Sequence, residues 1–279
     1  MTEADAIALA DAPRTRASLA ADLRALGVQA GEVLLVHSSL SSLGWVAGGP
    51  VAVLQALQDA LTPAGTLVMP TFTLNLTDPA GWRRFPVPQH WWATIRAETP
   101  AFDPALTLTR GMGRMAELFR TWPDVRRSHH PHSSFAAWGR HAEFITANHE
   151  LRFSLGEGSP LARVYDLNGR VLLLGTENNT SLHLAEVRAG KQATVQFSGP
   201  VLVDGQPQWV TFDECDYAEE TFPPVKAAFA ASGAVTVGKV GSASAKLMSQ
   251  RSLVDFAVQW WKTNPPVGHN SALAAQENA

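Results

Sequence analysis

Short apolar runs alternate with amphipathic segments along the first two thirds of the chain. Residues 33–36, 66–69 and 171–174 are apolar or nearly so, which is typical of strands buried on both faces. Between the first two runs, residues 50–61 carry apolar side chains at helical spacing and stop before Pro63. A strand, a helix and a strand in this order predict parallel strands joined by a right-handed crossover.

The later part of the chain has a different pattern. Alternating apolar and polar residues over 194–197 and 208–212 flank Asp204-Gly205, which is a hairpin signal. Residues 77–105 are rich in proline and tryptophan, so we expect an irregular excursion or lid there. The chain is therefore predicted to be α/β, with an antiparallel addition in its C-terminal third.

The length of 279 residues suits one large domain. We expect this domain over 13–268, with its antiparallel portion at 194–240. A short extension at 1–12 precedes it, and a small polar tail at 269–279 follows it.

Composition narrows the class of protein. Lys and Arg number 22 against 25 Asp and Glu, giving a net charge of −3 and a sequence pI near 6.3, which argues against a nucleic-acid binder. The sequence shows no apolar run of the roughly 18 residues that span a membrane and no basic segment of a secretory signal. We therefore expect a cytoplasmic protein with no membrane partner. The single cysteine, Cys215, excludes an internal disulfide and a cysteine-based metal cluster.

Polar residues follow three predicted strands at their carboxyl ends. These segments are 37–39, 70–73 and 175–186, and a fourth polar segment, 129–135, precedes another predicted strand. Ligands of open α/β sheets bind at the edge where strands end. The sequence therefore predicts hydroxyls, imidazoles and backbone amides at one rim.

The segment 175–186 holds the sharpest candidate pair. Asn179 or Thr180 is a good N-cap residue, which places His183 in the first turn of a helix and Glu186 on the same face. The helix dipole favours a neutral imidazole there, able to take a proton, and the carboxylate would orient the ring. A core-facing histidine beside an ordinary glutamate explains the same spacing.

The histidines also allow a metal-dependent hydrolase. Its ligands would be His37, His129, His132 and His183. Their spacing matches no short zinc motif and Cys215 is isolated, so no metal is expected. Asp213, Glu214 and Asp216 form a small acidic cluster, which is typical of a solvated turn.

Several motifs in order resemble one known family. They are His37-Ser38-Ser39-Leu40-Ser41-Ser42-Leu43-Gly44, Pro70-Thr71-Phe72-Thr73, His130-Pro131-His132-Ser133-Ser134-Phe135, Gly158-Ser159-Pro160-Leu161 and Asn179-Thr180-Ser181-Leu182-His183-Leu184-Ala185-Glu186. Together, over residues 15–262, they resemble the aminoglycoside 3-N-acetyltransferases. The resemblance implies a three-layer α/β sandwich with a mostly parallel central sheet. It also implies acetyl transfer from acetyl-CoA to the 3-amino group of a 2-deoxystreptamine ring.

The resemblance also implies site residues. His183 would be catalytic, with Glu186 as its partner. The acetyl-CoA side would comprise His37, Ser38, Ser39, Leu40, Ser41, Thr71, Phe72, Thr73, Arg110, Met112, Gly113, Ser133, Ser134 and Phe135. A polycationic acceptor needs carboxylates, for which the candidates are Glu157, Asp213 and Asp216.

The expected chemistry is direct transfer. An amine is mostly ammonium at neutral pH, and His183, with a reference pKa of about 6.5, suits its deprotonation. The amides or hydroxyls of Ser38 and Ser39 could hold the oxyanion. Cys215 sits in no nucleophile motif, which argues against an acyl-enzyme. A different amine acceptor and a non-catalytic CoA-binding protein are alternatives. The tryptophans of 77–105 would form a lid or the interface of a homodimer.

Overall fold

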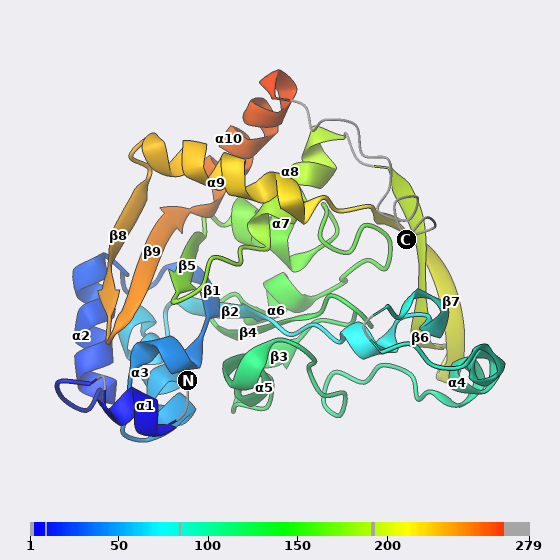
Figure 1. Ribbon diagram of the computed structural model, residues 1–279, viewed down its shortest axis with the longest axis horizontal. Helices are drawn as coiled ribbons and strands as arrows, with labels where there is room; N and C mark the ends of the chain where they lie inside the picture. Colours follow the sequence, from blue (N-terminus) through cyan, green and yellow to red (C-terminus); the bar gives the residue numbers. More distant parts are fainter. Residues whose placement is uncertain (1–2, 9, 84, 191–192, 265–279) are drawn as a thin grey trace.

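A seven-stranded sheet lies at the centre of the protein, with the strand order β3-β4-β2-β1-β5-β9-β8 (Figure 1). The computed structural model describes residues 3–8, 10–83, 85–190 and 193–264. The strands of the sheet are β1 (Val33–Ser38), β2 (Thr66–Pro70), β3 (Arg126–Arg127), β4 (Phe135–Gly139), β5 (Arg170–Leu174), β8 (Val235–Val240) and β9 (Ala243–Ser249).

The middle of the sheet is parallel. β1 pairs in parallel with β2 on one side and with β5 on the other. The outer neighbours β4, β3, β9 and β8 each join by antiparallel pairing. Following these pairings, β1, β2, β3, β5 and β8 run in one direction, and β4 and β9 in the other. The prediction of an α/β fold with a mostly parallel central sheet is confirmed.

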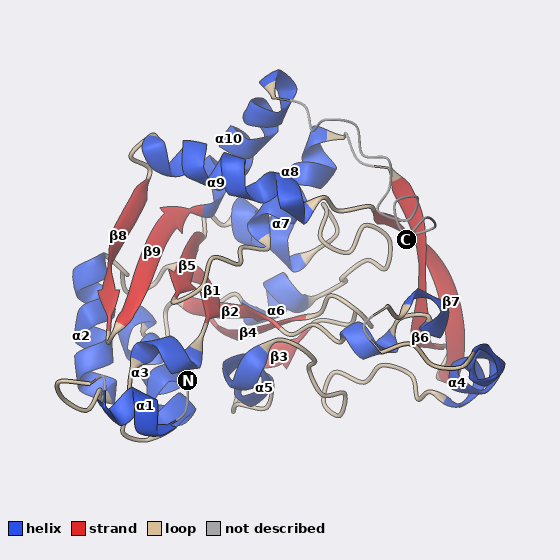
Figure 2. Ribbon diagram, viewed as in Figure 1, coloured by secondary structure: helices blue, strands red, loops and turns tan. Residues whose placement is uncertain are grey.

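Helices cover both faces of the sheet, because successive side chains of a buried strand point to opposite sides. Leu34 and Val36 pack in one hydrophobic cluster, and Val33 and Leu35 pack in another. The first face is covered by α2 (Arg16–Leu26), α3 (Gly49–Leu61) and α5 (Gly113–Arg120). The second is covered by α6 (Ala142–Thr146), α7 (Pro160–Asp166), α8 (Ser181–Ala189), α9 (Phe222–Ala231) and α10 (Gln250–Thr263) (Figure 2). The expected three-layer sandwich is confirmed.

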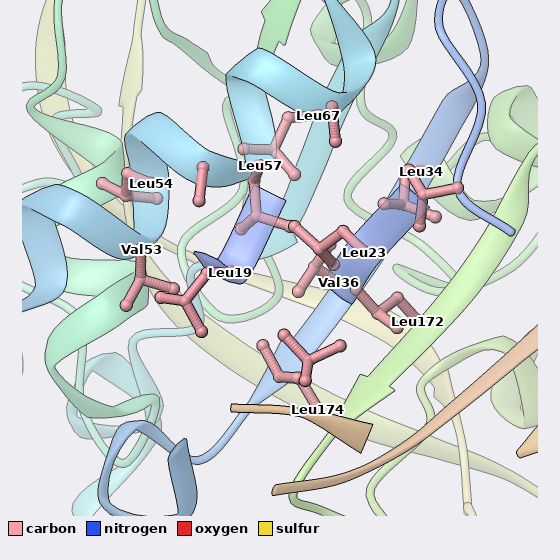
Figure 3. Close-up of a cluster of buried hydrophobic side chains, with 14 of the residues drawn as sticks. Leu19, Leu23, Leu34, Val36, Val53, Leu54, Leu57, Leu67, Leu172 and Leu174 are labelled. Atoms are coloured by element: carbon pink, nitrogen blue, oxygen red, sulfur yellow. The ribbon is translucent and has the colours of Figure 1, made fainter. Parts of the chain in front are cut away.

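Leucines dominate the first cluster. Leu19 and Leu23 of α2 and Leu54 and Leu57 of α3 lie over β1 and β5 (Figure 3). These four side chains are at most 1% exposed. Their spacing along each helix is three or four residues, which places them on one face and directs that face at the sheet.

A two-stranded antiparallel sheet stands apart from the central sheet. It consists of β6 (Thr194–Val203) and β7 (Gln206–Cys215), joined at Asp204-Gly205. Both turn residues have positive φ, 49° and 76°, as the tight hairpin turn requires. The antiparallel portion expected over 194–240 therefore divides, because 235–240 is β8 at the edge of the central sheet. β8 belongs to the central sheet because it pairs with β9, although it follows the hairpin in the sequence.

The proline-rich segment 77–105 packs against this hairpin. It contains short 3-10 turns and α4 (Trp92–Glu98), which lies beside β6 and β7 (Figure 1). Phe102 N–H donates to Pro200 O at 3.0 Å, and Ser198 Oγ donates to the carboxylate of Asp78 at 3.3 Å. None of its described residues lines the main cavity, and the excursion or lid expected at 77–105 stays a prediction.

The N-terminal extension contains α1 (Glu3–Ala8), whereas the tail expected at 269–279 lies outside the described residues. In the part of the chain that the structure describes, no helix combines the length and the apolar character needed to cross a membrane.

The packing of α3 can be tested by truncation. Leu57 is fully buried against β1, so Leu57→Ala is expected to lower the free energy of unfolding by about 2–5 kcal/mol, through lost burial and the cavity left behind. Leu106→Ala is the matched control, because Leu106 is 78% exposed, and it should change stability by less than about 0.5 kcal/mol. Urea unfolding measures both, and equal effects would contradict this account of the core.

Candidate active site

A cavity of about 1370 Å³ opens at the edge where β1, β2 and β5 end. Its wall comprises the ends of β1 and β2, the loop 176–180 after β5, and the first residues of α3, α5 and α8. Parallel strands deliver their carboxyl ends to one edge of the sheet, and this is why segments distant in sequence meet here. The three predicted strand ends do converge, whereas the segment 129–135 does not line the cavity.

His183 projects into this cavity from the first turn of α8. The helix begins at Ser181, after the N-cap residue Thr180, which makes no side-chain cap bond. The Ser181 N–H donates instead to Asn179 Oδ1 at 3.0 Å. His183 Nδ1 lies 3.2 Å from Glu186 Oε2, one turn along the helix. The other carboxylate oxygen, Oε1, accepts the N–H of Ala218 at 2.8 Å. Glu186 is 1% exposed and held at both oxygens, so it fixes the imidazole with Nδ1–H as the donor.

Aromatic side chains hold the His183 ring in place. Tyr217 lies 4.5 Å and Phe222 5.0 Å from it, between ring centroids. The remaining ring nitrogen, Nε2, lies 3.5 Å from Glu219 Oε1. Glu219 is an exposed residue of the cavity wall, so Nε2 faces the side from which a substrate would approach. With Nδ1 bound to Glu186, Nε2 presents a lone pair that can accept a proton.

Two helices begin at the cavity without a side-chain cap. Gly48 and Gly49 precede and open α3 with φ of 85° and 56°, a left-handed conformation that suits glycine, and Pro50 follows them. Met112 stands at the start of α5. The positive dipole ends of such helices attract anions such as phosphate. Arg114 and Lys226 add positive charge to the same wall.

The structure places the predicted acetyl-CoA residues in two groups. One group lines the cavity and comprises His37, Ser38, Ser39, Leu40, Ser41, Phe72, Met112 and Gly113. The other group does not line it and comprises Thr71, Thr73, Arg110, Ser133, Ser134 and Phe135. The role predicted for the second group in acetyl-CoA binding stays a prediction, and the contacts of these residues are as follows.

Arg127 binds two residues of the second group, Thr71 and Ser134, in the interior. Its guanidinium donates to Thr71 Oγ1 at 3.2 Å and Ser134 Oγ at 3.0 Å, and burial lowers its pKa to about 10. Ser133 Oγ receives the hydroxyl of Ser154 at 2.9 Å, and Thr73 Oγ1 donates to Pro131 O.

The last two residues of that group support Phe72. The rings of Phe135 and Phe72 meet edge to face, with 5.5 Å between centroids. The backbone N–H of the exposed Arg110 donates to the carbonyl of Phe72. The hydroxyls of Thr71, Thr73, Ser133 and Ser134 therefore bond to other protein groups in the interior, whereas Phe72 lines the cavity.

The carboxylates predicted for the acceptor also lie elsewhere. Glu157 pairs with Arg188 at 2.7 Å. Asp213 lines a separate, shallower cavity of about 500 Å³ on the hairpin, and Asp216 lines neither cavity. The acidic residues of the main cavity wall are Glu177 and Glu219. Sequence reasoning missed them, because they lie outside the motif strings and Glu219 follows the whole hairpin.

Comparison with known proteins identifies the family. The family model for aminoglycoside 3-N-acetyltransferase matches residues 35–262. The chain belongs to the aminoglycoside 3-N-acetyltransferase family. It is thus an acyltransferase of the aminoglycoside N(3)-acetyltransferase class.

Three similar proteins illustrate the match. The YokD aminoglycoside N(3')-acetyltransferase-like protein of Bacillus subtilis is 48% identical over 90% of this chain and 94% of its own length. Its crystal structure has a TM-score of 0.92, covering 95% of this chain and all of that one. AAC-IIIb, solved as a binary complex with CoASH, has a TM-score of 0.81 and 33% identity over 92% of this chain and all of that one. AAC-VIa bound to sisomicin has a TM-score of 0.81 and 30% identity over 92% and 100%.

Cys215 is not exposed to an acetyl donor in this acetyltransferase. The residue is 5% exposed at the end of β7 and does not line the cavity. Burial, with Glu186, Glu214 and Asp216 nearby, raises the pKa of its thiol to about 12. A thiol is a poor nucleophile in this form.

Three histidines, His130, His132 and His149, form a cluster in the interior of the acetyltransferase fold. His130 and His149 stack at 4.8 Å between centroids, and His132 contacts Phe212 at 5.3 Å. Each ring has its Nε2 within hydrogen-bond distance of a backbone carbonyl. The pairs are His130 with Leu151, His132 with Leu76, and His149 with Ser154. Within the described ranges, no three His, Cys, Asp or Glu side chains are grouped to hold a metal ion.

Alkylation tests the state of Cys215. The folded protein is expected to resist iodoacetamide at pH 8, because its thiol is buried and protonated, whereas the urea-unfolded chain reacts fully. Mass spectrometry of the intact protein gives the stoichiometry. Rapid labelling of the folded protein would show an accessible thiolate and reopen an acyl-enzyme route.

The histidine cluster makes stability depend on pH. Burial lowers the pKa of His132 and His149 to about 4, and that of His130 well below 6.5. The unfolded chain therefore binds more protons than the folded one below about pH 6.5, and stability falls as pH drops toward 4. His132→Gln keeps an N–H for Leu76 O but cannot titrate, so urea unfolding between pH 6.5 and 4.5 should give a shallower slope. An unchanged slope contradicts the assignment, whatever the variant's absolute stability.

Proposed function

We propose that this protein is an acetyl-CoA-dependent N-acetyltransferase that acetylates an aminoglycoside at the 3-amino group of its 2-deoxystreptamine ring. The observation that carries the proposal is the His183–Glu186 pair, buried and hydrogen-bonded at 3.2 Å, at the wall of a cavity of about 1370 Å³. That volume exceeds the usual range for one small ligand, as two substrates require. The neighbours solved with CoASH and with sisomicin support a donor and an acceptor of these classes.

The donor side of the cavity suits an anionic coenzyme. The uncapped beginnings of α3 and α5 offer backbone N–H groups, and Arg114 and Lys226 offer positive charge. Lys226 Nζ is already within 3.0 Å of Glu177 O, which limits where its charge can move. The phosphates of acetyl-CoA would lie at these groups, with the acetyl thioester at the end of β1 beside His183.

His183 acts as the general base in this proposal. The acceptor ammonium first loses one proton to solvent, and the nitrogen of the free amine attacks the thioester carbonyl carbon. Nε2 takes the second proton, which this nitrogen loses as the carbon–nitrogen bond forms. Glu186 stabilises the imidazolium that forms, since one carboxylate oxygen faces Nδ1. The carbon–sulfur bond breaks, and the leaving thiolate takes the proton back from His183. Transfer is direct, consistent with the buried, protonated Cys215.

Glu219 brings an exposed carboxylate to the acceptor side. Glu219 Oε1 lies 3.5 Å from His183 Nε2, and its side chain is 75% exposed. Glu177, the other acidic residue of the wall, is paired with Lys246 at 2.6 Å. Glu219 would therefore draw an ammonium group toward the general base, which favours a polycationic amine.

Release of CoA thiol tests the proposal. The native protein should release thiol from acetyl-CoA when a 2-deoxystreptamine aminoglycoside is present, and His183→Ala should lower kcat by at least 100-fold through loss of the base. His129→Ala is the matched control, because His129 is exposed and lines no cavity, and it should keep native rates. A chelator should change nothing.

Glu186→Gln tests in the same assay whether His183 acts as the general base. The amide keeps a partner for Ala218 N–H but turns an NH2 toward Nδ1, which leaves the proton on Nε2, the wrong tautomer. We expect a kcat loss of about 100-fold or more with an unchanged KM for acetyl-CoA. Acetylation of other amines only would reject the aminoglycoside, and full activity of His183→Ala would reject the mechanism.

A further inference from the structure

His37 is a second histidine of the cavity, and the mechanism above gives it no role. It stands at the carboxyl end of β1, in register with Leu173 of β5. It is 6% exposed and lines the same cavity as His183. A nearly buried imidazole that lines the cavity beside His183 is therefore a candidate for contact with a substrate.

The hydrogen bonds of His37 fix its tautomer. Its Nε2 accepts the backbone N–H of Thr180 at 3.4 Å, and the Thr180 hydroxyl lies 3.3 Å from the same nitrogen. Because Nε2 is the acceptor, the ring proton of a neutral imidazole sits on Nδ1. Nδ1 has no acceptor among the described residues, and it is not one of the fully buried polar atoms without a partner. Nδ1–H is therefore the part of the ring open to the cavity.

The ring stays neutral where the enzyme would work. Burial, together with the nearby charge of His183, lowers the pKa of His37 to about 3. The N–H of Thr180, just before α8, likewise disfavours a proton on Nε2. A neutral imidazole held against a helix N-terminus can polarise a carbonyl by donating a hydrogen bond.

The backbone N–H of Ser39, another candidate donor at this rim, is already engaged. The Ser39 N–H donates to Leu174 O at 2.8 Å, so it cannot serve the oxyanion as the sequence suggested. The Ser39 hydroxyl lies 3.4 Å from the Ser41 hydroxyl. Of the polar side chains at the end of β1, His37 offers a rigid, pre-oriented N–H that carries no other bond. Fixed donors aimed at developing charge are what stabilises a tetrahedral intermediate.

We propose that His37 Nδ1–H donates a hydrogen bond to the thioester carbonyl oxygen of acetyl-CoA and holds the oxyanion, a role that rests on the proposed function. The amine nitrogen forms a bond to the carbonyl carbon, and the C=O electron pair moves to the oxygen beside His37. When that pair returns, the carbon–sulfur bond breaks, and the thiolate leaves with the proton that His183 had taken. His37 keeps its own proton throughout.

Two amide variants separate this role from a structural one. The asparagine amide reaches about as far as Nδ1, so His37→Asn restores an N–H donor toward the cavity but loses the contact with Thr180. The glutamine amide reaches about as far as Nε2, so His37→Gln keeps an acceptor for Thr180 but loses the donor. We expect His37→Gln to lose about 100-fold or more in kcat, with little change in the KM for acetyl-CoA, and His37→Asn to stay within tenfold of native. The opposite order would overturn the proposal, because it would mean that His37 only positions α8.

A measurement without an acceptor keeps the test independent of the substrate assignment. Acetyl-CoA labelled with ¹³C at the carbonyl is bound to each protein, and its carbon chemical shift is compared with that of the free compound. A hydrogen bond to the oxygen moves the signal downfield, so native protein and His37→Asn should show the shift and His37→Gln should not. A native shift equal to that of free acetyl-CoA would overturn the role of His37. Failure of acetyl-CoA to bind would instead reject the proposed function and the inference with it.

Discussion

The parallel pairing of β1 with both β2 and β5 is the constraint on which the site depends. Because the three strands run together, their carboxyl ends and the loops that follow open at one edge. The side chains of β1 alternate between two buried helical layers until residue 36, and the pattern then changes to the polar residues His37 and Ser38. The sheet thus ends its apolar packing at the place where the cavity begins.

The buried carboxylate of Glu186 connects this edge to the rest of the molecule. An ionised group that is 1% exposed is stable only when its oxygens are hydrogen-bonded. One oxygen faces His183 on the same helix, and the other accepts the N–H of Ala218, which follows the hairpin. The chain leaving β7 is thereby held beside α8, and this contact also brings Tyr217, Glu219 and Phe222 to the His183 ring.

Local sequence patterns predicted the central strands and one pair of site residues. Continuous apolar runs located β1, β2 and β5, and the spacing of His183 and Glu186 located a pair that the structure joins at 3.2 Å. The failures are long-range. No local pattern indicates that Arg127 donates to the hydroxyl of Ser134. Likewise, no local pattern indicates that Glu219 approaches His183 of α8.

β8 shows the same limit of local sequence patterns. β8 looks like a continuation of the hairpin until its pairing with β9 is known, because pairing between distant segments leaves no mark on either segment alone. A homodimer and a cytoplasmic location concern partners and surroundings, which a single chain does not contain, and both stay predictions.

The two cavity histidines show how position decides chemistry for one side chain. His183 has a carboxylate at Nδ1, so a proton gained at Nε2 would give a charge that has a counter-ion. His37 has a backbone N–H at Nε2, so a proton there would meet a donor, and a charged His183 would oppose it further. In the proposed mechanism, the His183 ring changes its charge during a turnover and the His37 ring keeps its charge. A base and a fixed donor can therefore share a cavity without exchanging roles, because the partner of each ring, a carboxylate or an amide, determines which nitrogen holds the proton.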